Sequence, residues 1–161
     1  MERAFESEKF FEKIFVITLS AFVLVAFYAL ISMNGVVLGN DPAVHLEKAR
    51  IFLNTGRIPL ENLGWAPPLY SIMLSALIAF TGASSIEQMI LLVKAAAVII
   101  DWLLVLSVYL LGAKFFSKKV GASAAILLLM CVPMYEVNSW GGYTTVLGLA
   151  FMILLFSHLP L

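Results

Sequence analysis

Residues 14–38, IFVITLSAFVLVAFYALISMNGVVL, decide the fold, because this run of 25 residues carries no charged side chain. At 1.5 Å per residue, a helix of this length exceeds the roughly 30 Å hydrocarbon core of a bilayer. The preceding residues are mixed in charge and no small-residue cleavage site follows, which disfavours a signal peptide. We therefore expect a transmembrane helix that the mature protein keeps.

The composition of the whole chain agrees with this expectation. The 161 residues are 62% hydrophobic and 12% charged, whereas ordinary soluble domains are about 45–50% apolar. A soluble single domain is therefore excluded. The net charge is zero, so no long-range field attracts nucleic acid, and membrane lipid is the expected partner. A single cysteine, Cys131, excludes an intrachain disulfide framework.

Three further apolar stretches, residues 86–112, 120–134 and 142–159, predict transmembrane helices. Residues 66–80 are too short to cross a bilayer, because fifteen residues make only about 22 Å of helix, and we interpret them as a half-buried helix. Basic residues collect on the cytoplasmic side of membranes. Two basic clusters share the cytoplasmic side if there are four crossings and lie on opposite sides if there are five: Arg3, Lys9 and Lys13, and Lys114, Lys118 and Lys119.

We take the four-crossing arrangement, with both chain ends in the cytoplasm and residues 39–85 as one external loop. The predicted fold is an all-α, polytopic protein of the cell membrane. It has about four transmembrane helices in a single membrane domain, residues 1–161. The first external loop adds an amphipathic helix and the half-buried helix.

The amphipathic helix is predicted at residues 42–55, with Asn40 or Asp41 as its cap, Pro42 in its first turn and Gly56 after its end. Helical spacing gathers an apolar stripe and a polar flank. The stripe comprises Leu46, Ala49, Phe52 and Leu53, and the flank comprises Asp41, His45 and Lys48. We expect this helix to lie on a membrane surface with its polar flank turned away from lipid, either as a polar site or as a solvated helix face.

Two sets of charged residues are candidates for chemistry. Asp41 can be a general base or cation ligand at the external face, or simply a helix cap. Lys94 and Asp101, with Glu87 near the entrance, share one face of the second span at intervals of seven residues. An ionisable residue at membrane depth indicates function. The structural alternatives are that Lys94 extends to the interface and that Asp101 hydrogen bonds to a neighbouring helix.

The second external loop carries Glu136, a carboxylate on the same side as Asp41. The two form an acid pair or a divalent-cation site, for Mg²⁺ or Mn²⁺, if the two loops meet. Tyr143 is interpreted as an interfacial anchor, and Tyr70 belongs to an aromatic and proline-rich entry to the half-buried helix.

Three segments together resemble the beginning of membrane glycosyltransferases of the GT-C fold: GNDPAVHLEKARIFLNTGRIP (39–59), WAPPLYSIMLSALIAFTG (65–82) and YLLGAKFFSKK (109–119). The chain is most similar to the protein mannosyltransferase and aminoarabinose transferase branch, and more distantly to the catalytic subunit of oligosaccharyltransferase. These enzymes move a sugar from a polyprenyl or dolichyl phosphate carrier to an acceptor on the external face. The resemblance covers residues 14–157 but only part of the family's fold, which implies either the amino-terminal part of a longer enzyme or a small relative that needs a partner chain.

The resemblance implies roles for individual residues. Asp41 matches the acidic residue that acts as catalytic base or organises the acceptor, and Lys94 stands where many members place an arginine that contacts the carrier phosphate. Glu136 loosely matches an acidic metal-binding position. This sequence departs from the family in having Asp41 alone where an acidic pair is usual, and in having Asp101, which has no counterpart.

The sequence thus predicts a glycosyltransferase module that uses a lipid-phosphate sugar as donor. Asp41 is the catalytic candidate, and the substrate-binding candidates are His45, Lys48, Tyr70, Lys94 and Glu136. The alternatives are a noncatalytic subunit or lipid-binding scaffold of the same fold, and a small transporter built on Lys94 and Asp101. If the chain is a transporter, its activity should depend more on Asp101 than on Asp41. If it is a glycosyltransferase, its activity should depend more on Asp41 than on Asp101.

Overall fold

The computed structural model describes residues 2–32, 41–59, 67–131, 133, 137 and 141–159. In this part of the chain every regular element is an α-helix, which confirms the all-α prediction. The elements are α1 (Glu2–Ser32), α2 (Asp41–Thr55), α3 (Pro68–Thr81), α4 (Ile86–Phe115), α5 (Lys118–Leu129) and α7 (Tyr143–His158).

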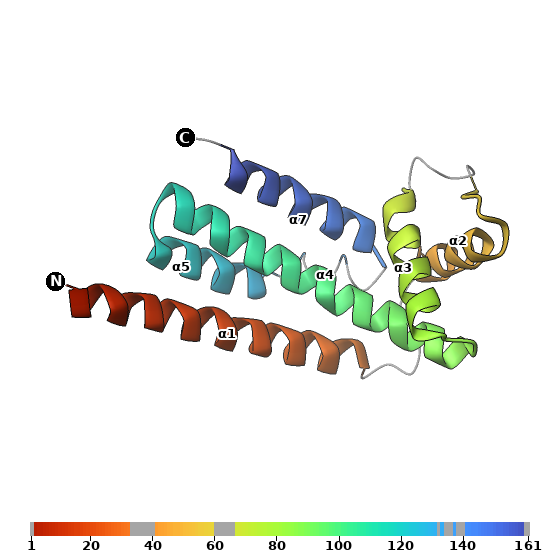
Figure 1. Cartoon of the computed structure of the whole chain (residues 1–161), viewed down its shortest axis with the longest axis horizontal. Helices are drawn as coiled ribbons and strands as arrows, with labels where there is room; N and C mark the ends of the chain where they lie inside the picture. The colour runs from red at the N-terminus through yellow and green to blue at the C-terminus, as the bar shows by residue number, and fades with distance from the viewer. Residues whose placement is uncertain are drawn as a thin grey trace.

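Helix α4 is the centre of the molecule (Figure 1). Its 30 residues make a rod of about 45 Å, and α1, α5 and α7 pack along it. Helices α2 and α3 pack on each other near the end of α4 that begins at Ile86, and both chain termini lie toward the opposite end (Figure 1). The molecule is therefore a helical bundle with a two-helix cap at one end.

Local sequence explains where the helices begin and end. Ser85 and Gln88 form a capping box, in which each side chain accepts a hydrogen bond from the other residue's backbone N–H, and this starts α4. Pro68 occupies the first position of α3, where its missing N–H costs nothing. Gly56 and Gly82 end α2 and α3 with φ of 68°, a left-handed conformation that favours glycine.

The predicted spans agree with the helices except at α1 and α5. Helix α1 starts twelve residues before the apolar run, and residues 33–38 lie outside the described residues. Helix α5 ends at Leu129, so the predicted end at residue 134 is wrong. A longer helix is blocked by Pro133, whose ring would clash with the carbonyl of Leu129. Twelve residues make only about 18 Å of helix.

At the end of the bundle opposite the two-helix cap, polar side chains connect the helices through hydrogen bonds and an ion pair. The Tyr109 hydroxyl donates to a Glu12 carboxylate oxygen at 3.1 Å, and the other oxygen of Glu12 pairs with the Lys118 ammonium at 2.7 Å. The Lys114 ammonium donates to the carbonyl of Leu159. The beginnings of α1 and α5 and the ends of α4 and α7 therefore meet at one end of the bundle.

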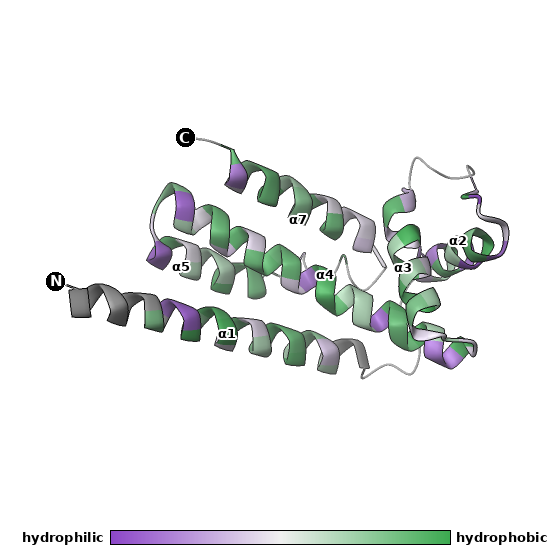
Figure 2. Cartoon of the chain, viewed as in Figure 1, coloured by the Kyte–Doolittle hydropathy of each residue, from purple (hydrophilic) through white to green (hydrophobic). Residues whose placement is uncertain are grey.

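Two of the described helices are long and apolar enough to cross a membrane. They are α1, through its window Glu12–Ala29, and α4, whereas α3 and α7 are apolar but shorter. A core helix of a soluble protein and an N-terminal signal sequence meet the same criteria. Figure 2 shows long hydrophobic runs in α1, α4, α5 and α7, with hydrophilic residues in α2, near several helix ends and at isolated positions within α1 and α4.

Candidate functional site

The polar flank of α2 faces the protein interior. His45 is only 1% exposed and Lys48 only 5% exposed, and Asp41 is half-buried. In contrast, Leu53 of the predicted apolar stripe is 40% exposed. The polar flank of α2 is therefore not a solvated face. Its apolar stripe is not buried along its whole length. The three polar candidates instead lie where α2 meets the rest of the molecule.

The imidazole of His45 contacts α3 directly. Its Nδ1 lies 3.2 Å from the Ser71 hydroxyl, and its ring meets the Tyr70 ring edge-on, with 5.0 Å between centroids. Both α3 residues are buried because they share the helix face that packs on α2. Ser71 was not among the predicted site residues, although it directly follows Tyr70, which was.

Tyr70 connects this pair of helices to α4 and α7. Its hydroxyl donates to the carbonyl of Val93 at 3.4 Å, and its ring centroid lies 5.6 Å from that of Tyr143. Tyr70 has no exposed surface and Tyr143 only 2%, so the interpretation of Tyr143 as an interfacial anchor is wrong. Tyr143, the first residue of α7, therefore forms a cluster of buried rings with Tyr70 and His45.

Lys94 and Asp101 bring two charges to the same region of α4. Lys94 directly follows Val93, is 7% exposed, and lies about 10 Å along the helix axis from Asp101, which is fully buried. Asp101 lies within electrostatic range of the Tyr143 hydroxyl. Glu87, the third member of the predicted face, is exposed and takes no part in this cluster.

The two predicted external loops do meet. Gly141 has φ of 88°, and a Cβ atom there would clash with the Pro42 ring and lie 3.2 Å from the Asp41 Cβ. Glycine is required at this position both by the backbone conformation and by the close approach. Glu136 lies outside the described residues, so the acid pair with Asp41 stays a prediction.

Burial controls the charge of the His45 imidazole. Removal from water lowers its pKa from 6.5 to about 4. The Lys48 ammonium adds to this effect, and the Asp41 carboxylate opposes it in part. At neutral pH the ring is therefore uncharged, and one nitrogen donates while the other accepts. The neutral imidazole and the Ser71 hydroxyl can therefore share one hydrogen bond, in which the donor depends on the tautomer of the ring.

Among the described residues no group of three His, Cys, Asp or Glu side chains could hold a metal ion. We refer to eight buried or half-buried polar residues of α2, α3, α4 and the start of α7 as the polar cluster: Asp41, His45, Lys48, Tyr70, Ser71, Lys94, Asp101 and Tyr143. Comparisons with protein families, with curated proteins and with solved structures find no match to this chain. Chemically, the polar cluster offers two carboxylates, two ammonium groups, a neutral imidazole and buried hydroxyls, and it extends from the two-helix cap to Asp101 in the middle of α4.

Proposed function

We propose that the chain is a multi-pass membrane module with four crossings, whose polar cluster lies at the external face and binds a polyprenyl-phosphate sugar. In this proposal it transfers the sugar to an acceptor, alone or with the remainder of a larger fold. The single observation that carries the proposal is the burial of three basic residues, His45, Lys48 and Lys94, in a bundle whose core is mostly apolar.

The outer surfaces of the bundle helices support insertion in a bilayer. Large apolar side chains are more than 60% exposed on α1 (Ile17, Val25), α5 (Leu127) and α7 (Leu155). Soluble proteins rarely expose contiguous apolar patches beyond a few hundred Å². A hydrocarbon environment removes this cost, and it also suits the length and composition of α1 and α4.

The charges of the polar cluster suit a phosphate carried on a lipid. Lys48 and Lys94 offset the charge that develops on a departing prenyl phosphate, and burial strengthens that effect because the local dielectric constant is low. Asp41, half-buried at the first turn of α2, takes the acceptor proton or orients the nucleophile. The site's apolar surroundings exclude water, which would otherwise compete with the acceptor.

Sugar transfer by the membrane-reconstituted chain, with its partner if it needs one, tests the proposal. Asp41→Asn should lower turnover by about 100- to 10,000-fold, the range for a positioned acid or base. Its thermal stability should stay close to that of the wild type, because Asn serves at a helix start almost as well as Asp. Normal transfer by Asp41→Asn would return this residue to a structural role.

Transport is the second candidate, and the complete burial of Asp101 within α4 is the observation that favours it. A coupled ion path depends on an intramembrane carboxylate, whereas glycosyl transfer depends on Asp41. Asp101→Asn should leave transfer nearly unchanged if the first proposal is correct. A loss of proton-coupled or ion-coupled uptake in Asp101→Asn, with no effect of Asp41→Asn, would favour transport.

A further inference from the structure

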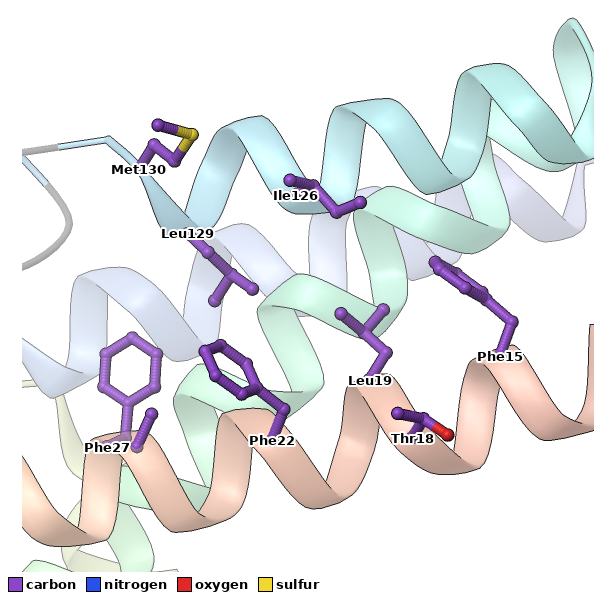
Figure 3. Close-up of a pocket in the computed structure, with 9 residues that line it drawn as sticks. Phe15, Thr18, Leu19, Phe22, Phe27, Ile126, Leu129 and Met130 are labelled. Atoms are coloured by element: carbon purple, nitrogen blue, oxygen red, sulfur yellow. The ribbon is translucent and has the colours of Figure 1, made fainter.

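A groove of about 450 Å³ runs between α1 and α5, and no residue of the polar cluster lines it (Figure 3). It exists because α1 packs along α4 but makes few contacts with the neighbouring α5. The main lining side chains are Phe15, Leu19 and Phe22 of α1, with Ile126 and Leu129 of α5 and Met130 at its end. Thr18 is the one lining residue with a polar side-chain atom.

The dimensions of the groove restrict what it can hold. From Phe15 to Phe27 it follows α1 for twelve residues, or about 18 Å. A helix with its side chains is about 10–12 Å across, so it would occupy roughly 1,400–2,000 Å³ over the same length. The volume of the groove is therefore too small to enclose a helix of a second copy or of a partner, and it suits one extended hydrocarbon chain.

The charges near one end of the groove indicate the kind of lipid. Phe15 packs on Tyr109, with ring centroids 5.8 Å apart, and Tyr109 contacts Glu12, the partner of Lys118. Lys13 and Lys119 are exposed at this same end. A chain entering beside Phe15 therefore brings its headgroup to a basic region, which favours an anionic headgroup.

We propose that this groove binds one acyl chain of an anionic phospholipid as a retained structural lipid. The inference rests on the membrane insertion in the proposed function and does not depend on sugar transfer. An acyl chain supplies atoms to side chains that otherwise face a void, and such contacts are the main source of packing energy within a bilayer. The acyl chain bound in the groove contacts both α1 and α5 and so holds the two helices together.

The test uses phosphatidylglycerol with a diazirine on one acyl chain, diluted into phosphatidylcholine vesicles that contain the full chain. After illumination, mass spectrometry maps the labelled peptides. We expect labels on the groove faces of α1 and α5. Ala26→Phe, which fills the groove, should reduce them at least several-fold. Ala21→Phe is the matched control, because Ala21 lies on the same helix, is exposed and does not line the groove.

Leu129→Phe fills the groove from the opposite wall and serves as the second variant in case Ala26→Phe fails to fold. The inference would be overturned if neither Ala26→Phe nor Leu129→Phe reduced the labelling of the groove peptides. Displacement of the label by excess polyprenyl phosphate, but not by excess unlabelled phosphatidylglycerol, would also overturn it and assign the groove to the sugar carrier. Alkaline carbonate extraction separates the two failures: release from the vesicles refutes membrane insertion, while retention without groove labelling refutes only the bound lipid.

Discussion

His45 is the titratable residue whose burial has the most direct consequence for stability. Its pKa is about 4 in the folded chain and near 6.5 when unfolded, so between these values the unfolded state binds more protons. Stability is therefore fully present above about pH 6.5 and should fall as the pH is lowered toward 4, by on the order of 1–3 kcal/mol. Thermal unfolding in detergent across this pH range measures the effect.

Two substitutions separate His45 from the carboxylates that also titrate at acid pH. His45→Gln keeps a hydrogen-bonding side chain beside Ser71 but cannot titrate, so it should remove this part of the pH dependence. The matched control His158→Gln, at the end of α7, keeps His45 and should keep the part of the pH dependence that His45 contributes. An unaltered acid transition in His45→Gln would contradict the role given to the imidazole.

Lys94 gives a second prediction at this scale. Lys94→Arg should retain binding of polyprenyl phosphate and Lys94→Met should lose it, because only the first keeps a cation at this buried position. Lipid-dependent thermal stabilisation in detergent is the measurement. Rescue of Lys94→Met by Asp101→Asn, with no stabilisation of the wild type by the lipid, would show a structural ion pair and refute the phosphate site.

The sequence predicted which residues of α2 share a flank but not the direction that flank faces. Helical spacing alone places Asp41, His45 and Lys48 together. Their burial depends on the polar and aromatic face of α3, a tertiary partner that periodicity within α2 cannot reveal. Tyr143 was misinterpreted for the same reason, since an aromatic residue near a helix end is equally suited to an interface or a core.

At the scale of elements, α4 and α5 pack closely through glycine. A side chain at Gly121 would come within 2.7 Å of the backbone nitrogen of Ala113, and one at Gly112 within 2.7 Å of the Gly121 Cα. Small residues allow such close packing of helices in membranes. The apolar runs of the sequence predicted α4 and α5. They could not predict the close packing, because it depends on how the turn between the two helices orients Gly112 and Gly121 toward each other.

Gly121→Ala should therefore force the two helices apart and destabilise the fold by about 1–3 kcal/mol, the usual cost of overpacking. Gly148→Ala in α7 is the matched control, because its added methyl group would meet nothing within 4 Å. That change should be neutral or slightly stabilising, since alanine favours helix more than glycine does. Equal unfolding midpoints for both variants would show that the α4 and α5 backbones are not held at this distance.

At the scale of the whole molecule, the contacts of Glu12 favour four crossings over five. Glu12 of α1 meets Tyr109 near the end of α4 and Lys118 at the start of α5, so the two basic clusters belong to one end of the bundle. A crossing by α3 would separate them across the bilayer.

Accessibility of single cysteines in intact cells tests this arrangement, in a Cys131→Ser background so that no native thiol reacts. Arg57 and Lys119 are both exposed and lie in opposite regions of the chain's proposed topology. With four crossings, a membrane-impermeant maleimide should label Arg57→Cys from outside and Lys119→Cys only after permeabilisation, because residue 119 then belongs to the cytoplasmic basic cluster. Labelling of both from outside would establish five crossings and place the basic turn between α4 and α5 on the external side. Labelling of Lys119→Cys alone would invert the molecule and put the polar cluster in the cytoplasm, where a sugar carried on the external leaflet could not reach Asp41.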